Sequence, residues 1–149
     1  MEKKLSNLTE SALTDVAERL GEKLSAGDIL ILTGDLGAGK TTFTKGLGRA
    51  LGIVQMIKSP TFMIVREYQG ASLKLYHMDV YRIGDDPDSF DMEDYFDAGG
   101  VCVIEWGELL GADMPANYLS VKFDKNANDT RTLTLTAHGK RYETLLSAS

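Results

Sequence analysis

One short glycine-rich stretch constrains the fold more strongly than any other part of the chain. Residues 34–41 read GDLGAGKT, which matches the pattern G-x-x-x-x-G-K-[ST]. The continuous apolar run ILILT precedes it, as is typical of a strand covered on both faces of a mostly parallel sheet. A helical pattern follows, with Phe43, Leu47 and Leu51 on one face and Gly52 as its expected C-cap. A strand, a glycine-rich loop and a helix in this order predict an α/β fold built around a P-loop.

The residue types in this stretch suit a phosphate chain. Glycines let successive backbone N–H groups converge on an anion, and the N-terminus of the following helix adds partial positive charge. We expect Lys40 to reach the β- and γ-phosphates and the Thr41 hydroxyl to bind Mg²⁺. The alternative, a glycine-rich turn with a solvated lysine, is disfavoured by the flanking strand and helix. The predicted nucleotide-binding residues of this stretch are Asp35, Leu36, Gly37, Ala38, Gly39, Lys40, Thr41 and Thr42.

A P-loop NTPase also needs a carboxylate at the end of a neighbouring buried strand, and the chain offers two. The run VCVI directly precedes Glu105, and LKLYHM precedes Asp79. Either carboxylate is a candidate to hold the metal and to orient the attacking water, and the choice between them stays open. Thr61 lies between the P-loop helix and these strands, where NTPases place a threonine that senses the γ-phosphate. His77 shares a face with Asp79, but a lone histidine is more often a packed or surface residue.

The remaining periodic segments complete a three-layer, P-loop NTPase-like α/β fold with a mixed, largely parallel central sheet. Helical spacing over residues 8–24, with Thr9 as the N-cap, predicts a first helix. Apolar or alternating runs predict strands at 29–33, 62–68, 72–81, 101–106, 119–123 and 131–137. The last two strands flank a polar turn and are expected to form a late antiparallel hairpin. Because no Pro-, Gly- or Ser-rich linker divides the chain, we expect one domain over residues 1–149.

Charge and composition restrict what the chain can bind. The formal net charge is −6, a poor surface for gripping nucleic acid, so work on nucleic acid would need a partner to hold it. Residues 85–97 carry seven carboxylates and no basic residue, and form either a solvated surface or a docking surface for a basic partner. The single cysteine, Cys102, excludes a disulfide framework and is expected in the core. Without a long apolar run or a signal-peptide pattern, a cytoplasmic protein is expected.

Sequence patterns favour ATP as the nucleotide and leave three functions open. No N-K-x-D motif is present, which weakens the guanine-specific GTPase hypothesis. A stand-alone kinase for a small metabolite needs cationic groups around the transferring phosphoryl group, but the arginines are scattered and residues 85–97 would repel phosphates. The other two hypotheses are an ATPase that depends on a protein partner and a nucleotide-dependent switch with little catalysis.

Several short motifs resemble those of the TsaE family, also called YjeE, in their order and approximate spacing. The P-loop alone is shared by many families, whereas the combination of SPTF, H-x-D-x-Y-R and E-W is much more specific. The resemblance extends from about Glu10 to the end of the chain. The matching motifs are GDLGAGKTTF (34–43), SPTF (59–62), HMDVYR (77–82), DYF (94–96) and IEW (104–106).

The resemblance implies a Mg²⁺-dependent ATPase of the bacterial cytoplasm that works with the TsaB–TsaD pair. Together these proteins attach a threonylcarbamoyl group to the adenosine beside the anticodon of certain tRNAs, and ATP hydrolysis is expected to reset the complex between turnovers. The tRNA would be contacted only through the partners, and no membrane is involved. By the same resemblance, Lys40 would bind phosphate, and Thr41 and Glu105 would bind the metal. Asp79 would act near the metal and the attacking water, and Thr61 would be a switch residue. Trp106 would support nucleotide-linked activity, and Glu10 and Arg131 would lie near the nucleotide.

Overall fold

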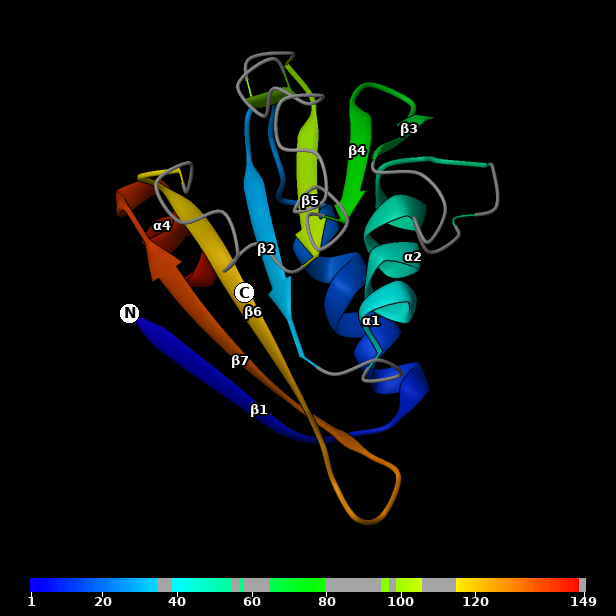
Figure 1. The fold of residues 1–149 in the computed structure, drawn as a ribbon, viewed down its shortest axis with the longest axis vertical. Helices are drawn as coiled ribbons and strands as arrows, with labels where there is room; N and C mark the ends of the chain where they lie inside the picture. The colour runs from blue at the N-terminus through cyan, green and yellow to red at the C-terminus, as the bar shows by residue number, and fades with distance from the viewer. Residues whose placement is uncertain are drawn as a thin grey trace.

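The computed structural model describes residues 1–34, 39–54, 57, 65–79, 95–96, 99–105 and 115–147. Its helices and strands are β1 (Glu2–Leu8), α1 (Glu10–Gly21), β2 (Ile29–Thr33), α2 (Lys40–Ala50), β3 (Val65–Gln69), β4 (Lys74–Asp79), β5 (Val101–Glu105), β6 (Tyr118–Lys125), β7 (Arg131–His138) and α4 (Lys140–Ser147) (Figure 1). Apart from Tyr95 and Phe96, the acidic segment 85–97 lies outside the described residues. No helix within the described ranges is long and apolar enough to cross a membrane.

The described strands form one seven-stranded sheet in the order β1-β7-β6-β2-β5-β4-β3. β2 lies between β6 and β5 and runs parallel to both, and β5 is also parallel to β4. The pairings of β1 with β7, of β6 with β7 and of β3 with β4 are antiparallel. The predicted α/β class, the mixed sheet and the late hairpin are therefore confirmed, and the parallel pairings hold the four central strands together.

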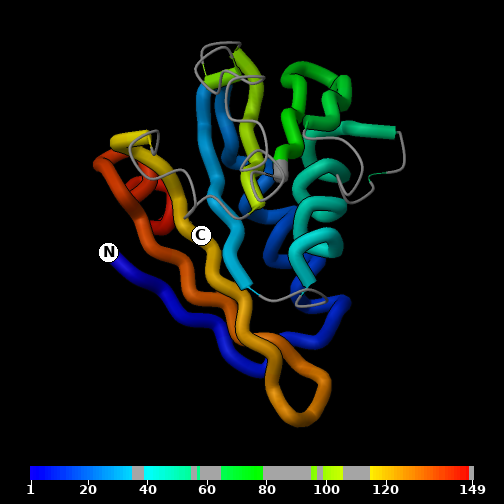
Figure 2. Tube along the Cα trace, viewed as in Figure 1, coloured from blue at the N-terminus to red at the C-terminus, as the bar shows by residue number. Residues whose placement is uncertain are grey.

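The N-terminal strand β1 is an element that the sequence patterns do not predict. It runs antiparallel beside β7, at the edge of the sheet (Figure 2). Its side chains are exposed or half-buried along its whole length, and its sequence EKKLSNL has no regular alternation of apolar and polar residues. Lys3 and Lys4 are typical of an edge strand, where charge discourages pairing with another chain.

The helices α1 and α2 pack against each other and against one face of the sheet (Figure 1). Gly46 of α2 allows the close approach, because a Cβ there would lie 2.6 Å from the Cβ of Ala17 in α1. Phe43 of α2 meets Phe123 of β6 edge-on, with ring centroids 5.5 Å apart. These side chains belong to the large core cluster, to which α4 also contributes. The C-cap of α2 is Leu51, one residue before the predicted Gly52, which has φ 80° as is typical directly after a helix end.

A smaller apolar cluster lies on the opposite face of the sheet and includes Cys102. The cysteine is 1% exposed, which confirms its predicted place in the core. Its thiol donates a hydrogen bond to the carbonyl oxygen of Tyr95 at 3.4 Å. Burial raises the pKa of this thiol to about 12. The thiol therefore stays protonated at neutral pH and acts as a small apolar side chain.

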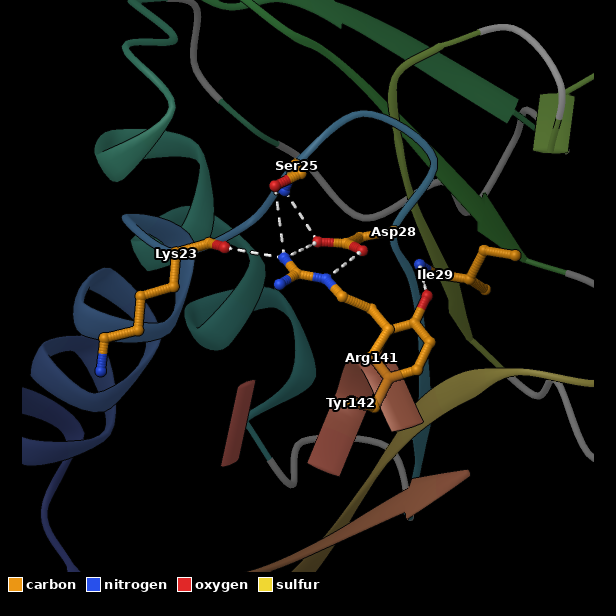
Figure 3. A network of polar contacts seen from close by, with 6 residues as sticks. All are labelled: Lys23, Ser25, Asp28, Ile29, Arg141 and Tyr142. Carbon is orange, nitrogen blue, oxygen red and sulfur yellow. Dashed lines mark hydrogen bonds and ion pairs between the residues drawn. The ribbon is translucent and has the colours of Figure 1, made fainter. Parts of the chain in front are cut away.

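A polar network ties α4 to the turn before β2 (Figure 3). The Arg141 guanidinium donates to both carboxylate oxygens of Asp28, at 3.2 and 2.8 Å, and to the carbonyl oxygen of Lys23 at 3.0 Å. The backbone N–H of Ser25 donates to the same carboxylate at 2.7 Å. The Tyr142 hydroxyl accepts a hydrogen bond from the first N–H of β2 at 2.8 Å. We name these contacts the α4 clamp, and they fasten the C-terminal helix at the amino end of β2.

Candidate functional site

The P-loop connects the carboxyl end of β2 to the amino end of α2, and a glycine lies at each of its ends. Gly34 has φ 139°, and a Cβ there would lie 2.7 Å from the carbonyl oxygen of Phe123. Gly39 has φ 103°, and a Cβ there would lie 2.8 Å from Cδ2 of Leu13. A side chain at either position would meet backbone strain, and at Gly34 it would also clash with the backbone of β6. Both glycines are thus favoured by their positive φ angles, and Gly34 is favoured also by the closeness of β6.

The amino end of α2 is open to an anion. Its N-cap is Gly39, which offers no capping oxygen, and its first turn contains no acidic residue. The first N–H groups of the helix therefore keep their partial positive charge available for an external ligand. The neighbouring helix α1 differs, because the Thr9 side chain accepts a hydrogen bond from the N–H of Ala12 at 3.2 Å and Glu10 lies in the first turn. This confirms Thr9 as the N-cap of α1.

Lys40 and Glu105 form a buried ion pair beside the P-loop. Their side chains are 4% and 8% exposed, and Nζ of Lys40 lies 3.8 Å from Oε1 of Glu105. The same Nζ donates to the carbonyl oxygen of Gly34 at 2.8 Å. Glu105 is the last residue of β5 and pairs in register with Leu32 of β2, just before the P-loop begins. The parallel pairing of β2 with β5 therefore brings the carboxylate to the loop.

His77 is a second partner of Glu105. It is fully buried in β4, and its Nε2 lies 2.7 Å from Oε2 of Glu105. An ionised carboxylate only accepts hydrogen bonds, so in this contact the Nε2–H tautomer of His77 is the donor to Glu105. The structure thus shows His77 as a packed residue that also contacts a candidate metal ligand.

Lys40 and Glu105 line a pocket of about 530 Å³ at the carboxyl edge of the central strands. The start of α1, the start of α2 and the tip of the β6–β7 hairpin converge at this edge (Figure 1). Its volume is within the range of small-molecule sites. The lining residues are Thr9, Glu10, Leu13, Gly39, Lys40, Thr41, Thr42, Glu105, Asn128, Asp129, Thr130 and Arg131. The structure therefore brings together seven of the predicted site residues: Glu10, Gly39, Lys40, Thr41, Thr42, Glu105 and Arg131.

Sequence reasoning missed the hairpin tip as part of this pocket. The tip is held by its own hydrogen bonds, from the Asn126 amide to Thr130 Oγ1 at 3.0 Å and from Thr130 Oγ1 to Asn128 Oδ1 at 2.6 Å. Arg131 donates from Nη1 to the carbonyl oxygens of Asp129 and Thr130, each at 3.2 Å. Only the placement of β6 beside β2 carries this turn to the P-loop, and no local pattern in the sequence indicates that placement.

The other predicted site residues are placed in part or not at all. Asp79 ends β4, and its backbone pairs in register with Glu105, so the two candidate carboxylates come from adjacent strand ends. The side chain of Asp79 lies outside what the structure describes. The same holds for Asp35, Leu36, Gly37, Ala38, Thr61 and Trp106.

The donor set of the pocket fits a Mg²⁺–nucleotide. In the part of the chain that the structure describes, no three His, Cys, Asp or Glu side chains cluster as they would in an all-protein metal cage. Thr41 and Glu105 instead offer a hydroxyl and a carboxylate on the same pocket as Lys40. Mg²⁺ prefers such oxygen ligands and is usually bound by one or two carboxylates together with phosphates and water.

Comparisons with known proteins agree with this geometry. The family model described as "Threonylcarbamoyl adenosine biosynthesis protein TsaE" matches residues 8–133. A Bacillus subtilis protein named tRNA threonylcarbamoyladenosine biosynthesis protein TsaE is 48% identical over 119 residues, which are 80% of this chain and 75% of that protein. A Streptomyces coelicolor protein of the same name is 37% identical over 141 residues, which are 89% of this chain and 95% of that protein.

The fold is also similar to that of a solved structure. The crystal structure of YdiB from Bacillus subtilis matches with a TM-score of 0.88 at 37% identity, and the match covers 99% of this chain and 93% of that chain. The sequence matches and the fold match point to the same family. The chain belongs to the TsaE family, the proteins of tRNA threonylcarbamoyladenosine biosynthesis.

Proposed function

We propose that this chain binds ATP with Mg²⁺ and hydrolyses it as the partner of TsaB–TsaD in the threonylcarbamoyl modification of the adenosine beside the anticodon of tRNA. The observation that carries the proposal is the buried pair of Lys40 and Glu105, 3.8 Å apart, at the start of α2. A lysine, a helix N-terminus and a carboxylate at one site are the groups that phosphoryl transfer requires.

The predicted site residues that line the pocket have the following roles in this proposal. Lys40 and the first N–H groups of α2 bind the phosphates, and they stabilise negative charge as the terminal phosphoryl group departs. Thr41 and Glu105 hold Mg²⁺, which supplies Lewis-acid stabilisation of the phosphate oxygens when bound. Glu10 and Arg131 line the same pocket from α1 and β7 and lie near the nucleotide.

The roles of three further residues rest on the family resemblance and on the backbone. Asp79 is proposed to act near the metal and the attacking water, because its strand end adjoins that of Glu105. Thr61 is proposed as the residue that responds to the γ-phosphate, and Trp106 as a support of nucleotide-linked activity.

We also propose that a partner controls the reaction. The isolated chain is expected to hydrolyse ATP slowly, and TsaB–TsaD to accelerate it, with hydrolysis resetting the complex between turnovers. A net charge of −6 disfavours direct contact with tRNA, so we expect the tRNA to be contacted through the partners. The reaction is expected to take place in the cytoplasm.

ATP hydrolysis by the chain alone, with TsaB–TsaD, and with TsaB–TsaD and tRNA tests the proposal. Lys40→Ala should lower the stimulated rate on the order of 10²-fold, as is typical when a group that stabilises transition-state charge is removed. Lys45→Ala removes an exposed lysine of the same helix and is the matched control, expected within about twofold of the unmodified protein. Equal rates with and without the partners would refute the partner dependence, and equal rates for the two variants would refute the site.

Glu105→Ala separates an ATPase from a switch. If hydrolysis is needed, this variant should still bind nucleotide but lose tRNA modification in the reconstituted system. If nucleotide binding alone is the signal, modification should persist. ADP formation that depends on a small metabolite and on no partner would instead favour the kinase hypothesis.

A further inference from the structure

We propose that His77 is a positioning residue for the nucleotide site, which fixes the Glu105 carboxylate so that one of its oxygens stays turned toward Lys40 and the pocket. This inference rests on the proposed function and assigns a task to a residue outside the pocket lining. The two oxygens of Glu105 are divided between two partners: Oε2 lies 2.7 Å from Nε2 of His77, and Oε1 lies 3.8 Å from Nζ of Lys40.

The strand register explains how His77 reaches this carboxylate. In the parallel pairing of β4 with β5, His77 is opposite Val103, and Glu105 follows two residues later on the same face. His77 therefore contacts Glu105 from deeper in the sheet, while Lys40 approaches from the P-loop. The face is the one that α1 and α2 cover, so water has little access to the contact.

The polar chemistry of His77 is directed at Glu105. Its side chain is 0% exposed, and among the described residues no hydrogen-bond partner is found for its other ring nitrogen, Nδ1. Burying a ring with one nitrogen unsatisfied is unfavourable, and its neighbours in β4 and β5, Leu75 and Val103, are apolar. The bond to Glu105 accounts for a polar side chain at this position.

A fixed carboxylate matters because metal binding depends on the orientation of its ligands. A hydrogen bond to one oxygen of a ligating carboxylate sets its plane, and loss of such a bond typically weakens metal affinity by 10- to 100-fold. Without His77, Glu105 can rotate about its side-chain bonds and need not present Oε1 to the pocket. The expected defect is in the Mg²⁺ dependence of nucleotide binding, with Lys40 and the P-loop still able to bind phosphate.

The test is a titration of a fluorescent ATP analogue, in EDTA and at increasing Mg²⁺, with thermal unfolding measured on the same samples. His77→Leu removes the donor and should raise the Mg²⁺ concentration needed for half-maximal tightening by about tenfold or more, with affinity in EDTA within about threefold. His77→Gln should restore the Mg²⁺ dependence, because its terminal amide N–H lies near the place of Nε2. Tyr142→Phe, which loses a buried hydrogen bond in the α4 clamp, controls for lost stability and should leave the Mg²⁺ dependence unchanged.

Four results would overturn the inference. An unchanged Mg²⁺ dependence in His77→Leu would remove it and leave the proposed function intact, whereas absence of Mg²⁺-dependent binding in the unmodified protein would overturn both. Equal defects in His77→Leu and His77→Gln would show that His77 acts through packing alone. If His77→Leu fails to fold, His77→Asn takes its place. The shorter asparagine amide lies where Nδ1 does, so this variant should keep the defect in Mg²⁺ dependence. Equal Mg²⁺ dependence in His77→Asn and His77→Gln would refute the positioning role.

Discussion

Replacing Arg141 by methionine should destabilise the protein by about 2 kcal/mol, a value that follows from how deeply its partner is buried. The Asp28 side chain is 6% exposed, while that of Arg141 is 41% exposed. Breaking a fully buried ion pair costs about 3–5 kcal/mol, and an exposed pair contributes about 0–1 kcal/mol. The clamp lies between these limits, because the N–H of Ser25 still donates to the carboxylate after Arg141 is removed. Methionine keeps most of the aliphatic stem, so the change reports mainly on the guanidinium.

The hydrogen bond to Asp28 raises the pKa of the Arg141 guanidinium above its ordinary value, so the guanidinium stays charged across any practical pH range. Urea unfolding measures the loss of free energy directly, and about 2 kcal/mol corresponds to a fall in Tm of about 4–8 °C for a chain of this size. The matched control is Arg49→Met, because Arg49 also bonds a carboxylate, that of Glu18, at 2.7 Å. Its side chain is 70% exposed, and its loss should cost less than about 0.5 kcal/mol.

A double-mutant cycle with Asp28→Asn isolates the interaction from the effect of each single change. The two substitutions should be strongly non-additive, since each removes the same pair. If Arg141→Met lowers stability no more than Arg49→Met does, or if the cycle shows no coupling, the argument from burial is wrong. Nucleotide affinity should be unaffected by either arginine substitution, because neither side chain lines the P-loop pocket.

One further substitution and one thiol-labelling reaction test the packing of the fold. Gly46→Ala should lower the free energy of unfolding in urea by about 1–3 kcal/mol, because the new methyl would lie 2.6 Å from Ala17 Cβ and 2.9 Å from the carbonyl oxygen of Thr14. An unchanged unfolding midpoint would contradict the close contact between α1 and α2. Since burial raises the pKa of the Cys102 thiol to about 12, alkylation at pH 8 should be at least about a hundredfold slower in the folded protein than in urea, and equal rates would contradict that burial.

Elements with strong local signals could be predicted from the sequence. The Thr9 cap and the Gly52 terminus delimit α1 and α2, and the apolar run before the P-loop predicts β2. β1 could not be predicted, because an edge strand with half-exposed side chains has no clear period and its partner β7 comes from the far end of the chain. Local patterns indicate the ends and faces of elements but not which strands pair.

The same limit applies to the candidate site. Glu105 could be proposed because four apolar residues directly precede it and because P-loop proteins need a carboxylate at such a strand end. The contact of His77 with Glu105 depends on the register between β4 and β5, and a shift of one residue would turn His77 to the other face of the sheet. The hairpin tip at Asn128 likewise joins the pocket only because β6 lies beside β2. The residues that sequence reasoning missed are those placed by tertiary pairing.

The two ends of β2 separate stability from function. At the amino end, the carboxylate of Asp28 accepts hydrogen bonds from Arg141 and from the backbone, so its burial is offset within the protein itself. At the carboxyl end, Lys40 donates to the carbonyl oxygen of Gly34 and Glu105 contacts His77, but the two charged groups lie 3.8 Å apart, too far for a hydrogen bond to each other, on a pocket that a ligand can fill. Burying these charges is unfavourable for folding to the extent that the contacts within the protein do not offset it. Functional sites are expected to contain buried polar groups that lower the stability of the free protein and that gain favourable contacts when a ligand binds. The carboxyl end is therefore the place where bound nucleotide and Mg²⁺ should stabilise the protein most.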